Sequence, residues 1–320
     1  MRAAGGEGRC AAMLSRIAES LFWLGRYVER AEDTARILDV QYHLLLEDPW
    51  ANEEATCRAL LDVMGLGGQV EEPDAESVTH LLAFDDSYSG SIAGGLGAAW
   101  KNARSVRDAI SLELWESLNS TWLSLPTQAQ RTSRRAPHLF FGWVKERCAV
   151  FAGLADSTMS RDDGWRFLVL GRSLERVDMT ARMLSLRFAD GDGHSGWATT
   201  LSCCSAYEAY LRTYQRAVDA SLAAEFLLLD RLFPRSVFAA LRTAEECLAD
   251  LAPESGRMGV DDEARRALGR ARTTLEFHTV DELLSDLPGH LARVRALCAE
   301  AAGAVADRSF HQARPVQWTA

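Results

Sequence analysis

The sequence lacks long apolar runs, paired cysteines and an excess of basic charge, and each absence excludes a class of protein. Its longest apolar runs, such as 148–154 and 226–229, fall far short of the roughly 20 residues that cross a bilayer. Residues 1–12 contain no apolar stretch of the kind found in a secretory signal. We therefore predict no membrane-spanning segment, a disordered extension over 1–12, and a helical pattern that begins at Met13.

The cysteines and the net charge exclude further classes of protein. Seven cysteines are scattered along the chain with no C-x-x-C spacing, which argues against a disulfide framework and fits a reducing cytosol. The net charge of −10 disfavours binding to nucleic acid or to anionic membranes, because both require a basic face. We expect a soluble cytoplasmic protein with no nucleic-acid partner and no membrane partner.

Familiar catalytic motifs are also missing. The sequence contains no G-x-x-x-x-G-K-[ST], H-E-x-x-H or G-x-S-x-G pattern, so P-loop nucleotide binding, zincin chemistry and an esterase elbow lack support. The seven histidines are dispersed, and the glycine-rich stretch 94–97 follows no strand pattern. We predict no cofactor.

What the sequence has in abundance is helical periodicity. Proline and glycine are sparse, and apolar residues recur every three to four positions. This pattern predicts an all-α multi-helix bundle, with helices over 13–47, 52–64, 75–83, 91–124, 137–158, 162–189, 203–230, 235–250, 261–276 and 280–308. Loops are predicted at 65–73, 125–137, 189–196 and 252–260, with 125–137 as the sharpest boundary, and Asp261 and Asp281 are predicted N-caps.

Two segments of the chain repeat one another. Residues 24–40 read LGRYVERAEDTARILDV, residues 170–186 read LGRSLERVDMTARMLSL, and nine of the seventeen aligned positions are identical. The copies lie 146 residues apart, which indicates two related halves rather than a many-unit solenoid. We expect a single domain over 13–320, with halves of approximately 13–130 and 137–310 that face each other about a pseudo-two-fold axis.

Each copy places a polar row beside the apolar stripe that faces the core. The rows are Gly25, Glu29, Glu32 and Arg36 in the first copy and Gly171, Glu175, Asp178 and Arg182 in the second. A glycine inside a helix costs about 1 kcal/mol relative to alanine, so its presence in both copies indicates that a helix or a ligand approaches closely.

Four further arginines of the repeats project toward a third face: Arg26, Arg30, Arg172 and Arg176. The pairs Glu32–Arg36 and Asp178–Arg182 are four residues apart, which allows ion pairs along one helix. The charged residues form either a structural set of ion pairs or a cleft whose guanidinium groups clasp a carboxylate or phosphate. The sequence leaves both interpretations open.

Other acidic residues lie outside the repeats: Glu113, Glu116, Glu225 and Asp230. Each belongs to a segment whose other face is strongly apolar. We interpret them either as counter-ions of the repeat arginines or as further walls of a shared polar cleft.

A carboxylate metal site is a further alternative. Four-helix di-iron proteins supply carboxylates from facing helices, as Glu29-x-x-Glu32 and Glu175-x-x-Asp178 could do. However, neither repeat contains the usual Glu-x-x-His pattern, and the nearby arginines would repel a cation. We therefore predict no metal and keep a ferritin-like metalloprotein as an alternative.

Four segments together carry a family resemblance. MLSRIAESLFWLGRYVERAEDTARILDV, NARSVRDAISLELWESLN, WRFLVLGRSLERVDMTARML and EFLLLDRLFPRSV resemble, in order and spacing, the bacterial Alpha-E family, a predicted helical domain named for its acidic and Glu-Arg motifs. The chain departs from the family pattern at 99–101, where it has Ala-Trp-Lys instead of Ala-Arg-Glu. The motif residues carry over to nine repeat positions, with Asp178 in place of a second glutamate: Arg26, Glu29, Arg30, Glu32, Arg36, Arg172, Glu175, Arg176 and Arg182.

The resemblance implies a bacterial protein that is encoded beside, or fused to, a circularly permuted ATP-grasp protein. ATP-grasp enzymes activate a carboxylate as an acyl phosphate for attack by an amine, so this company implies peptide or amide synthesis. We expect an accessory or substrate-binding component of such a ligase system, whose paired Arg/Glu helices hold the partner enzyme or an anionic or zwitterionic ligand such as a small peptide. An enzyme that acts on an amide or aminoacyl substrate through clustered carboxylates is the alternative, and the sequence leaves open whether the chain is catalytic.

Overall fold

A computed structural model describes the backbone of residues 4–47, 52–132, 136–189, 194–253 and 259–310, and the side chains of these ranges other than 4–14, 186–189 and 194–195. Helices account for all the regular structure in these ranges, and no strand occurs within them. The predicted all-α class is therefore confirmed. None of the helices described combines the length and the apolar character that crossing a bilayer requires.

The described helices follow one another with short connections. They are α1 (Ala4–Glu47), α2 (Glu53–Met64), α3 (Ala75–Thr79), the π-helical η1 (His80–Phe84), α4 (Ile92–Ser105), the 3-10 segment η2 (Arg107–Ala109), α5 (Leu112–Thr132), α6 (Pro137–Thr158), α7 (Asp163–Ala189), α8 (His194–Cys203), α9 (Tyr207–Tyr214), α10 (Ala220–Leu229), α11 (Val237–Leu251), α12 (Glu263–Phe277), α13 (Val280–Ser285) and α14 (Leu287–Ser309). The first helix begins at Ala4, so its backbone takes in most of the segment for which the sequence predicts disorder.

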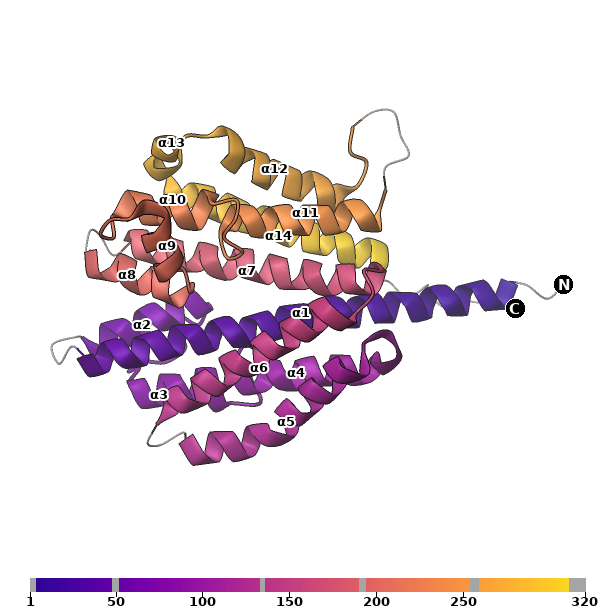
Figure 1. The fold of residues 1–320 in the computed structure, drawn as a ribbon, viewed down its shortest axis with the longest axis horizontal. Coiled ribbons are helices and arrows are strands. Elements are labelled where there is room, and N and C mark those ends of the chain that lie inside the picture. Colours follow the sequence, from indigo (N-terminus) through magenta and orange to yellow (C-terminus); the bar gives the residue numbers. More distant parts are fainter. Residues whose placement is uncertain (1–3, 48–51, 133–135, 190–193, 254–258, 311–320) are drawn as a thin grey trace.

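The two repeat segments lie on α1 and α7, which run side by side through the middle of the bundle (Figure 1). On one side α4 and α6 pack against α1, and α5 packs against both of them. On the other side α11 and α14 pack against α7, and α12 packs against both of these. The apolar stripes of the repeats are buried between these layers, as Leu24 and Leu170 illustrate with no exposed surface.

The glycines of the repeats allow the two central helices to touch. A Cβ atom added to Gly25 would collide with the backbone carbonyl oxygen of Leu168, and one added to Gly171 would collide with that of Phe22. Because backbone atoms occupy the space of both missing side chains, any larger residue would push the helices apart. Close helix approach therefore explains why a glycine stands at the same place in both copies.

The sharpest predicted boundary does separate two helices, α5 and α6, but the loop is shorter than predicted. The predicted loop at 125–137 is helical as far as Thr132, because α5 continues through Pro126. A proline inside a helix costs about 3 kcal/mol, since it removes a backbone hydrogen bond and clashes with the preceding turn. Here Leu125 is buried and α5 packs along α6, so tertiary packing outweighs the local preference.

Two predicted long helices are each divided in the structure. The segment 91–124 breaks into α4, η2 and α5, and the hydroxyl of Ser111 accepts a hydrogen bond from the amide of Leu114 at 3.2 Å, which stabilises the new helix start. The segment 203–230 breaks at Ser205 and Gln215, which both have a positive φ, and α10 then starts at its N-cap Asp219. Such local breaks leave little trace in apolar periodicity.

The predicted helix caps are displaced by one or two residues. The N-cap of α12 is Asp262, whose side chain accepts from the amide of Arg265, rather than Asp261. The N-cap of α13 is Thr279, which forms a capping box with Glu282, while Asp281 lies in the first turn. The predicted helix 280–308 is also divided, because α14 begins anew behind its own N-cap, Asp286.

Candidate functional site

The repeat arginines and glutamates pair across the two central helices. Arg26 Nε donates to Glu175 Oε2 at 2.8 Å, and Arg30 Nε donates to Glu175 Oε1 at 2.5 Å. In the opposite direction, Arg176 donates from Nε and Nη2 to the two carboxylate oxygens of Glu29 at 2.6 and 2.9 Å. We call these five residues the Arg/Glu network. It joins α1 to α7 through one carboxylate from each helix.

Both carboxylates of the network are enclosed. Glu29 is 2% exposed and Glu175 is fully buried, so each would be strongly destabilising without its guanidinium partners. Burial by itself would raise the pKa of Glu29, but the positive charges of Arg176 and Arg235 outweigh it and lower that pKa to about 2. The network therefore holds Glu29 in the ionised form.

A loop residue far along the chain extends the network. Arg235, just before α11, binds Glu32 through Nη2 at 2.7 Å and Glu29 through Nη1 at 3.1 Å, and it also pairs with Asp33. Glu32 in turn accepts from Arg36 Nε at 3.1 Å, as the predicted pair four residues apart requires. The sequence reasoning missed both Arg235 and Asp33, although Arg235 lies inside the EFLLLDRLFPRSV segment.

Asp33 differs electrostatically from its neighbours. Burial raises its pKa to about 7, and the nearby carboxylates of Glu29 and Glu32 add to the rise, while Arg235 opposes it. One guanidinium shared among three acids does not stabilise all three charges equally. In the second copy the position of Asp33 is occupied by Met179, so this titrating acid has no counterpart there.

The polar row of the second copy is also paired. Arg182 Nε donates to Asp178 at 2.6 Å, again as the spacing of four residues predicts, and Arg295 of α14 donates to the other oxygen of Asp178 at 2.8 Å. Arg182 also donates to the carbonyl oxygen of Val63 at 3.1 Å, which ties α7 to the end of α2. These contacts connect the central helices to the outer layers.

The four acids outside the repeats lie elsewhere. Glu113 and Glu116 are exposed at the start of α5, and Asp230 accepts from the amides of Leu232 and Phe233 in its own loop. Glu225 lies on α10, where its charge helps to raise the pKa of Tyr214, mainly an effect of burial, to about 12. The described contacts join none of these four acids to a repeat arginine. The repeat arginines pair instead with Glu29, Glu32, Glu175 and Asp178 of the repeats and with Asp156 of α6.

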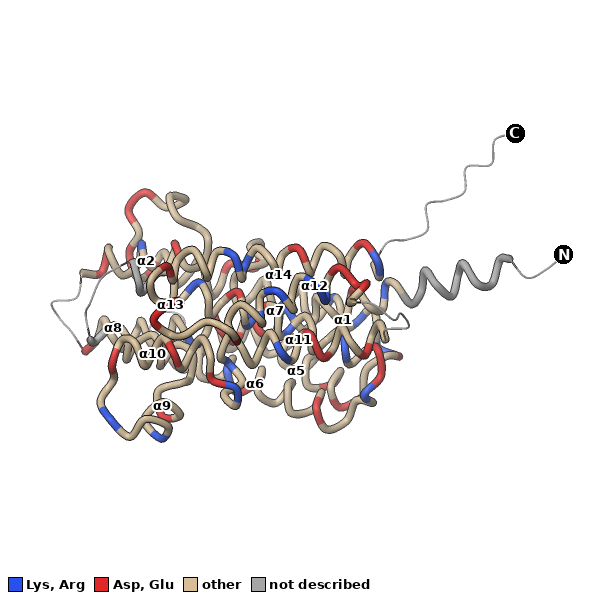
Figure 2. Tube along the Cα trace, turned by 90° about the horizontal axis from the view of Figure 1, so that it is seen from above, with Lys and Arg blue, Asp and Glu red and all other residues tan. Residues whose placement is uncertain are grey.

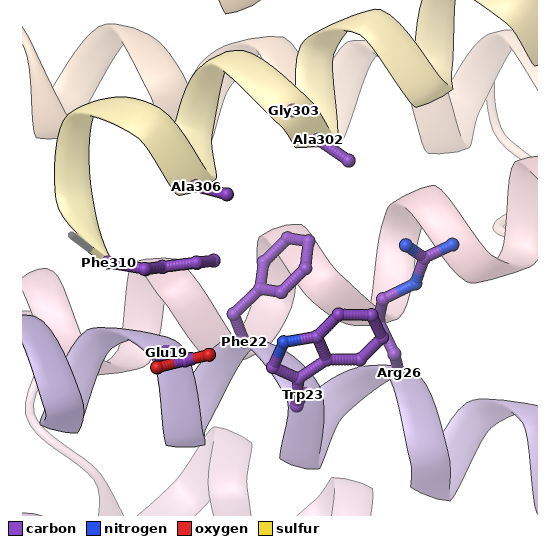
Figure 3. Close-up of a pocket in the computed structure, with 8 residues that line it drawn as sticks. All are labelled: Glu19, Phe22, Trp23, Arg26, Ala302, Gly303, Ala306 and Phe310. Atoms are coloured by element: carbon purple, nitrogen blue, oxygen red, sulfur yellow. The ribbon is translucent and has the colours of Figure 1, made fainter. Parts of the chain in front are cut away.

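One arginine of the network reaches a surface hollow. The walls of this hollow, which has a volume of about 520 Å³, include Phe22, Trp23 and Arg26 of α1 and Ala302, Gly303 and Phe310 at the end of α14 (Figure 3). We call it the Arg26 hollow. Arg26 binds Glu175 through Nε alone, and no hydrogen bond joins either terminal nitrogen to a described residue. Its guanidinium also lies 5.5 Å from the ring centre of Trp23.

Comparison with known proteins decides the family. The model of the Alpha-E family, described as a predicted alpha-helical domain with a conserved ER motif, matches residues 13–310. The chain belongs to the Alpha-E family. The Glu-Arg pairs at 29–30 and 175–176, which supply both carboxylates of the Arg/Glu network, fit that description.

Curated relatives of this Alpha-E chain come from mycobacteria. Uncharacterized protein Rv2567 of Mycobacterium tuberculosis and uncharacterized protein Mb2597 of Mycobacterium bovis are both 26% identical to it over 322 residues. These matches cover 91% of this chain and 36% of each relative, so the chain spans about a third of the length of the curated relatives it matches. No solved structure matches the Alpha-E chain.

The described part of the Alpha-E domain contains no group of three or more His, Cys, Asp or Glu side chains placed to hold a metal ion. Two of the carboxylates considered for a di-iron site are already occupied by arginines: Glu175 accepts hydrogen bonds from Arg26 and Arg30, and Glu29 accepts two from Arg176. A cation would have to displace these guanidinium groups. Lys and Arg positions are interspersed with Asp and Glu positions along the helices in general, so the acids of the bundle have basic residues nearby (Figure 2).

Proposed function

We propose that this Alpha-E chain is a ligand-binding accessory component of an ATP-grasp amide or peptide ligase system, and that Arg26 binds the carboxylate or other anionic group of the ligand. The observation that carries this proposal is the position of Arg26, which extends from the buried Glu175 to the wall of the Arg26 hollow. The bond to Glu175 uses Nε, so the two terminal nitrogens stay available as a fork for a bidentate anion.

A comparison between the two repeats supports a carboxylate as the ligand group. Arg172, the counterpart of Arg26, lies 3.8 Å from a carboxylate of the protein itself, Asp156 of α6. The two repeat copies are offset by 146 residues, and the same offset makes Ala302, which lines the Arg26 hollow, the counterpart of Asp156. Where Arg172 has the carboxylate of Asp156, Arg26 therefore has the methyl group of Ala302 and the open space of the hollow.

The hollow has the properties of a small-molecule site. Its volume of about 520 Å³ lies within the usual range of such pockets, and its walls combine aromatic rings with one cation, Arg26, and one exposed acid, Glu19. The side chain of Arg26 is 18% exposed, so an anion bound there would be partly shielded from water and would interact more strongly than on an open surface.

The rest of the Arg/Glu network serves as the framework that holds Arg26. Arg176 already uses all three nitrogens, two on Glu29 and one on the carbonyl oxygen of Pro234, and a ligand could bind it only by displacing these contacts. Arg30 binds Glu175 through Nε, like Arg26, but it does not line the Arg26 hollow. The same enclosure weighs against the catalytic alternative, because an acid–base residue must reach a ligand and both Glu29 and Glu175 are covered by guanidinium groups.

The ATP-grasp partner rests on the family resemblance. Such enzymes activate carboxylates, so a protein that presents or retains a carboxylate-bearing molecule suits their chemistry. Co-expression of this chain with the ATP-grasp protein of its gene neighbourhood, followed by affinity purification and assay of ligase turnover, tests the partnership. We expect a stable complex and a change in turnover. Separate elution of the two proteins together with unchanged turnover would refute the partnership.

The ligand site is tested with two substitutions in α14. Ala302→Asp installs at the Arg26 hollow the carboxylate that Arg172 has from Asp156, and Gly303→Leu places a larger side chain where an added Cβ meets no atom within 4 Å. Gly153→Leu on α6 is the matched control, since its added Cβ also meets nothing. In a saturation-transfer NMR screen of amino acids, dipeptides and simple carboxylates, we expect signals from the wild type and the control. Signals that survive unchanged in both α14 variants would contradict the proposed site.

We also infer that the two halves are related by a pseudo-two-fold axis, with the boundary between α6 and α7 rather than at 130–137. The matched packing supports this: α1 packs against α4 and α6 as α7 packs against α11 and α14. A second pair of equivalent segments adds to it. Ser91 Oγ and Ser236 Oγ each donate to the carbonyl oxygen six residues earlier, of Asp85 and Asp230, and each caps the helix that follows.

A further inference from the structure

A second hollow lies on the other side of Trp23. It has a volume of about 710 Å³ and lies between α1 and the end of α4 with η2, where Tyr27, Asn102 and Asp108 contribute to its walls. We call it the Asp108 hollow. It shares two wall residues, Glu19 and Trp23, with the Arg26 hollow. These two side chains of α1 therefore form the border between the hollows.

The ring of Trp23 that separates the hollows is held in place from several sides. Tyr27 stacks on it with ring centres 5.6 Å apart and planes at 30°, and Phe22 meets it edge-on at 5.7 Å. The guanidinium of Arg26 lies near it as well. A fixed aromatic face is a suitable support for a planar group such as a peptide bond, because the ring loses little freedom when a ligand binds.

The two hollows differ in charge. The Arg26 hollow has one arginine with free terminal donors and the shared acid Glu19, whereas the Asp108 hollow has Glu19, a second acid, Asp108, and one arginine, Arg16. No ion pair joins Glu19 or Asp108 to another of the described residues, and both side chains are exposed. One end of the composite site therefore suits a negative group and the other suits a positive group.

We infer that both hollows together bind one molecule, a short unblocked peptide that crosses Trp23, with its carboxylate at Arg26 and its α-ammonium group at Asp108 and Glu19. This inference rests on the proposed function and names the ligand class. Each hollow alone has the volume of a small-molecule site, so the pair exceeds what a single amino acid fills. A peptide supplies the three required features: an anionic end, a cationic end and planar amides between them.

The first experiment identifies a peptide ligand. The full-length chain is equilibrated by dialysis with a library of tripeptides whose ends are free, and the peptides enriched on the protein side are identified by mass spectrometry. The best peptide is then measured by calorimetry in three forms: free, N-acetylated and C-amidated. Hydrogen bonds to charged groups are strong enough that we expect each blocked form to bind at least about tenfold more weakly.

Variants locate the two ends of the peptide. Asp108→Asn should weaken the free peptide about tenfold and leave the N-acetylated peptide unaffected, whereas Ala302→Asp should weaken the free and the N-acetylated peptide alike. Asp86→Asn is the matched control, because Asp86 is another exposed acid outside both hollows. We expect this control to bind every form like the wild type.

The outcomes separate this inference from the proposed function. If N-acetylation and Asp108→Asn change nothing while C-amidation and Ala302→Asp abolish binding, the carboxylate site stands and the peptide inference is wrong. If no tripeptide is enriched but simple carboxylates give NMR signals that Ala302→Asp removes, the peptide inference is likewise wrong. If blocked and free peptides bind the α14 variants as tightly as the wild type, both proposals are wrong.

Discussion

Replacing Glu175 by glutamine should destabilise the protein by removing one charge from the centre of the Arg/Glu network. The carboxylate is fully buried and accepts hydrogen bonds from Arg26 at 2.8 Å and Arg30 at 2.5 Å. Glutamine keeps the shape but turns an NH₂ group toward one of these donors. Breaking a buried ion pair by removing one partner costs about 3–5 kcal/mol, because the remaining charges stay buried without compensation.

Urea unfolding followed by circular dichroism measures this effect. For a chain of 320 residues, about 3–5 kcal/mol corresponds to a fall in melting temperature on the order of 4–7 °C. The control is Glu113→Gln, which alters an exposed acid and should change the free energy of unfolding by less than about 0.5 kcal/mol. A loss below about 1 kcal/mol for Glu175→Gln would refute the claim that this carboxylate holds α1 and α7 together.

Three further predictions follow from the same contacts. Gly25→Ala should lower the melting temperature strongly, because its Cβ would collide with the carbonyl oxygen of Leu168. Gly153→Ala has open space around its Cβ and should raise the free energy of unfolding by up to about 1 kcal/mol. Equal melting curves for the two variants would contradict the close helix contact. Asp33 has a pKa of about 7 in the folded chain against about 4 when unfolded, so the folded state binds more protons between these two values. The unfolding free energy should therefore fall as pH rises from 5 to 8, and Asp33→Asn should flatten this dependence. An unchanged slope in urea titrations at several pH values would show that another group titrates. Arg235→Met should destabilise the protein by about 3–5 kcal/mol, because Glu29, Glu32 and Asp33 lose a shared partner. Adding Asp33→Met, which introduces the residue that the second copy has at Met179, should restore part of the loss in a double-mutant cycle. Strictly additive effects would mean that the two residues are not coupled.

Periodicity and repetition in the sequence predict much of this fold. The spacing of apolar residues locates most helices, and the duplicated LGR…ER segment identifies the two helices that lie at the centre. The repeated glycine correctly indicates a close approach, since Gly25 and Gly171 each face a backbone carbonyl. These features are predictable because they depend on patterns within one helix or between two copies of it.

Other features depend on contacts that no local pattern encodes. The helix through Pro126 persists because Leu125 is buried against a neighbouring layer, and Arg235 joins Asp33 across a separation of 202 residues. The Arg26 hollow is lined on the α14 side by Ala302, which has only a methyl group, and by Gly303, which has no side chain. Sequence reasoning names Arg26 as a site residue, but only the packing of α14, which forms a hollow at Arg26, distinguishes it from Arg30 and from the fully engaged Arg176.

The most direct test of the central claim is the dissociation constant of a carboxylate ligand from the NMR screen, measured side by side for the wild type, Ala302→Asp and Gly153→Leu. If Arg26 is the anion site, the α14 variant should bind at least about tenfold more weakly while the α6 control matches the wild type. Equal dissociation constants for all three proteins would contradict the account, because a carboxylate placed beside Arg26 would then have displaced nothing.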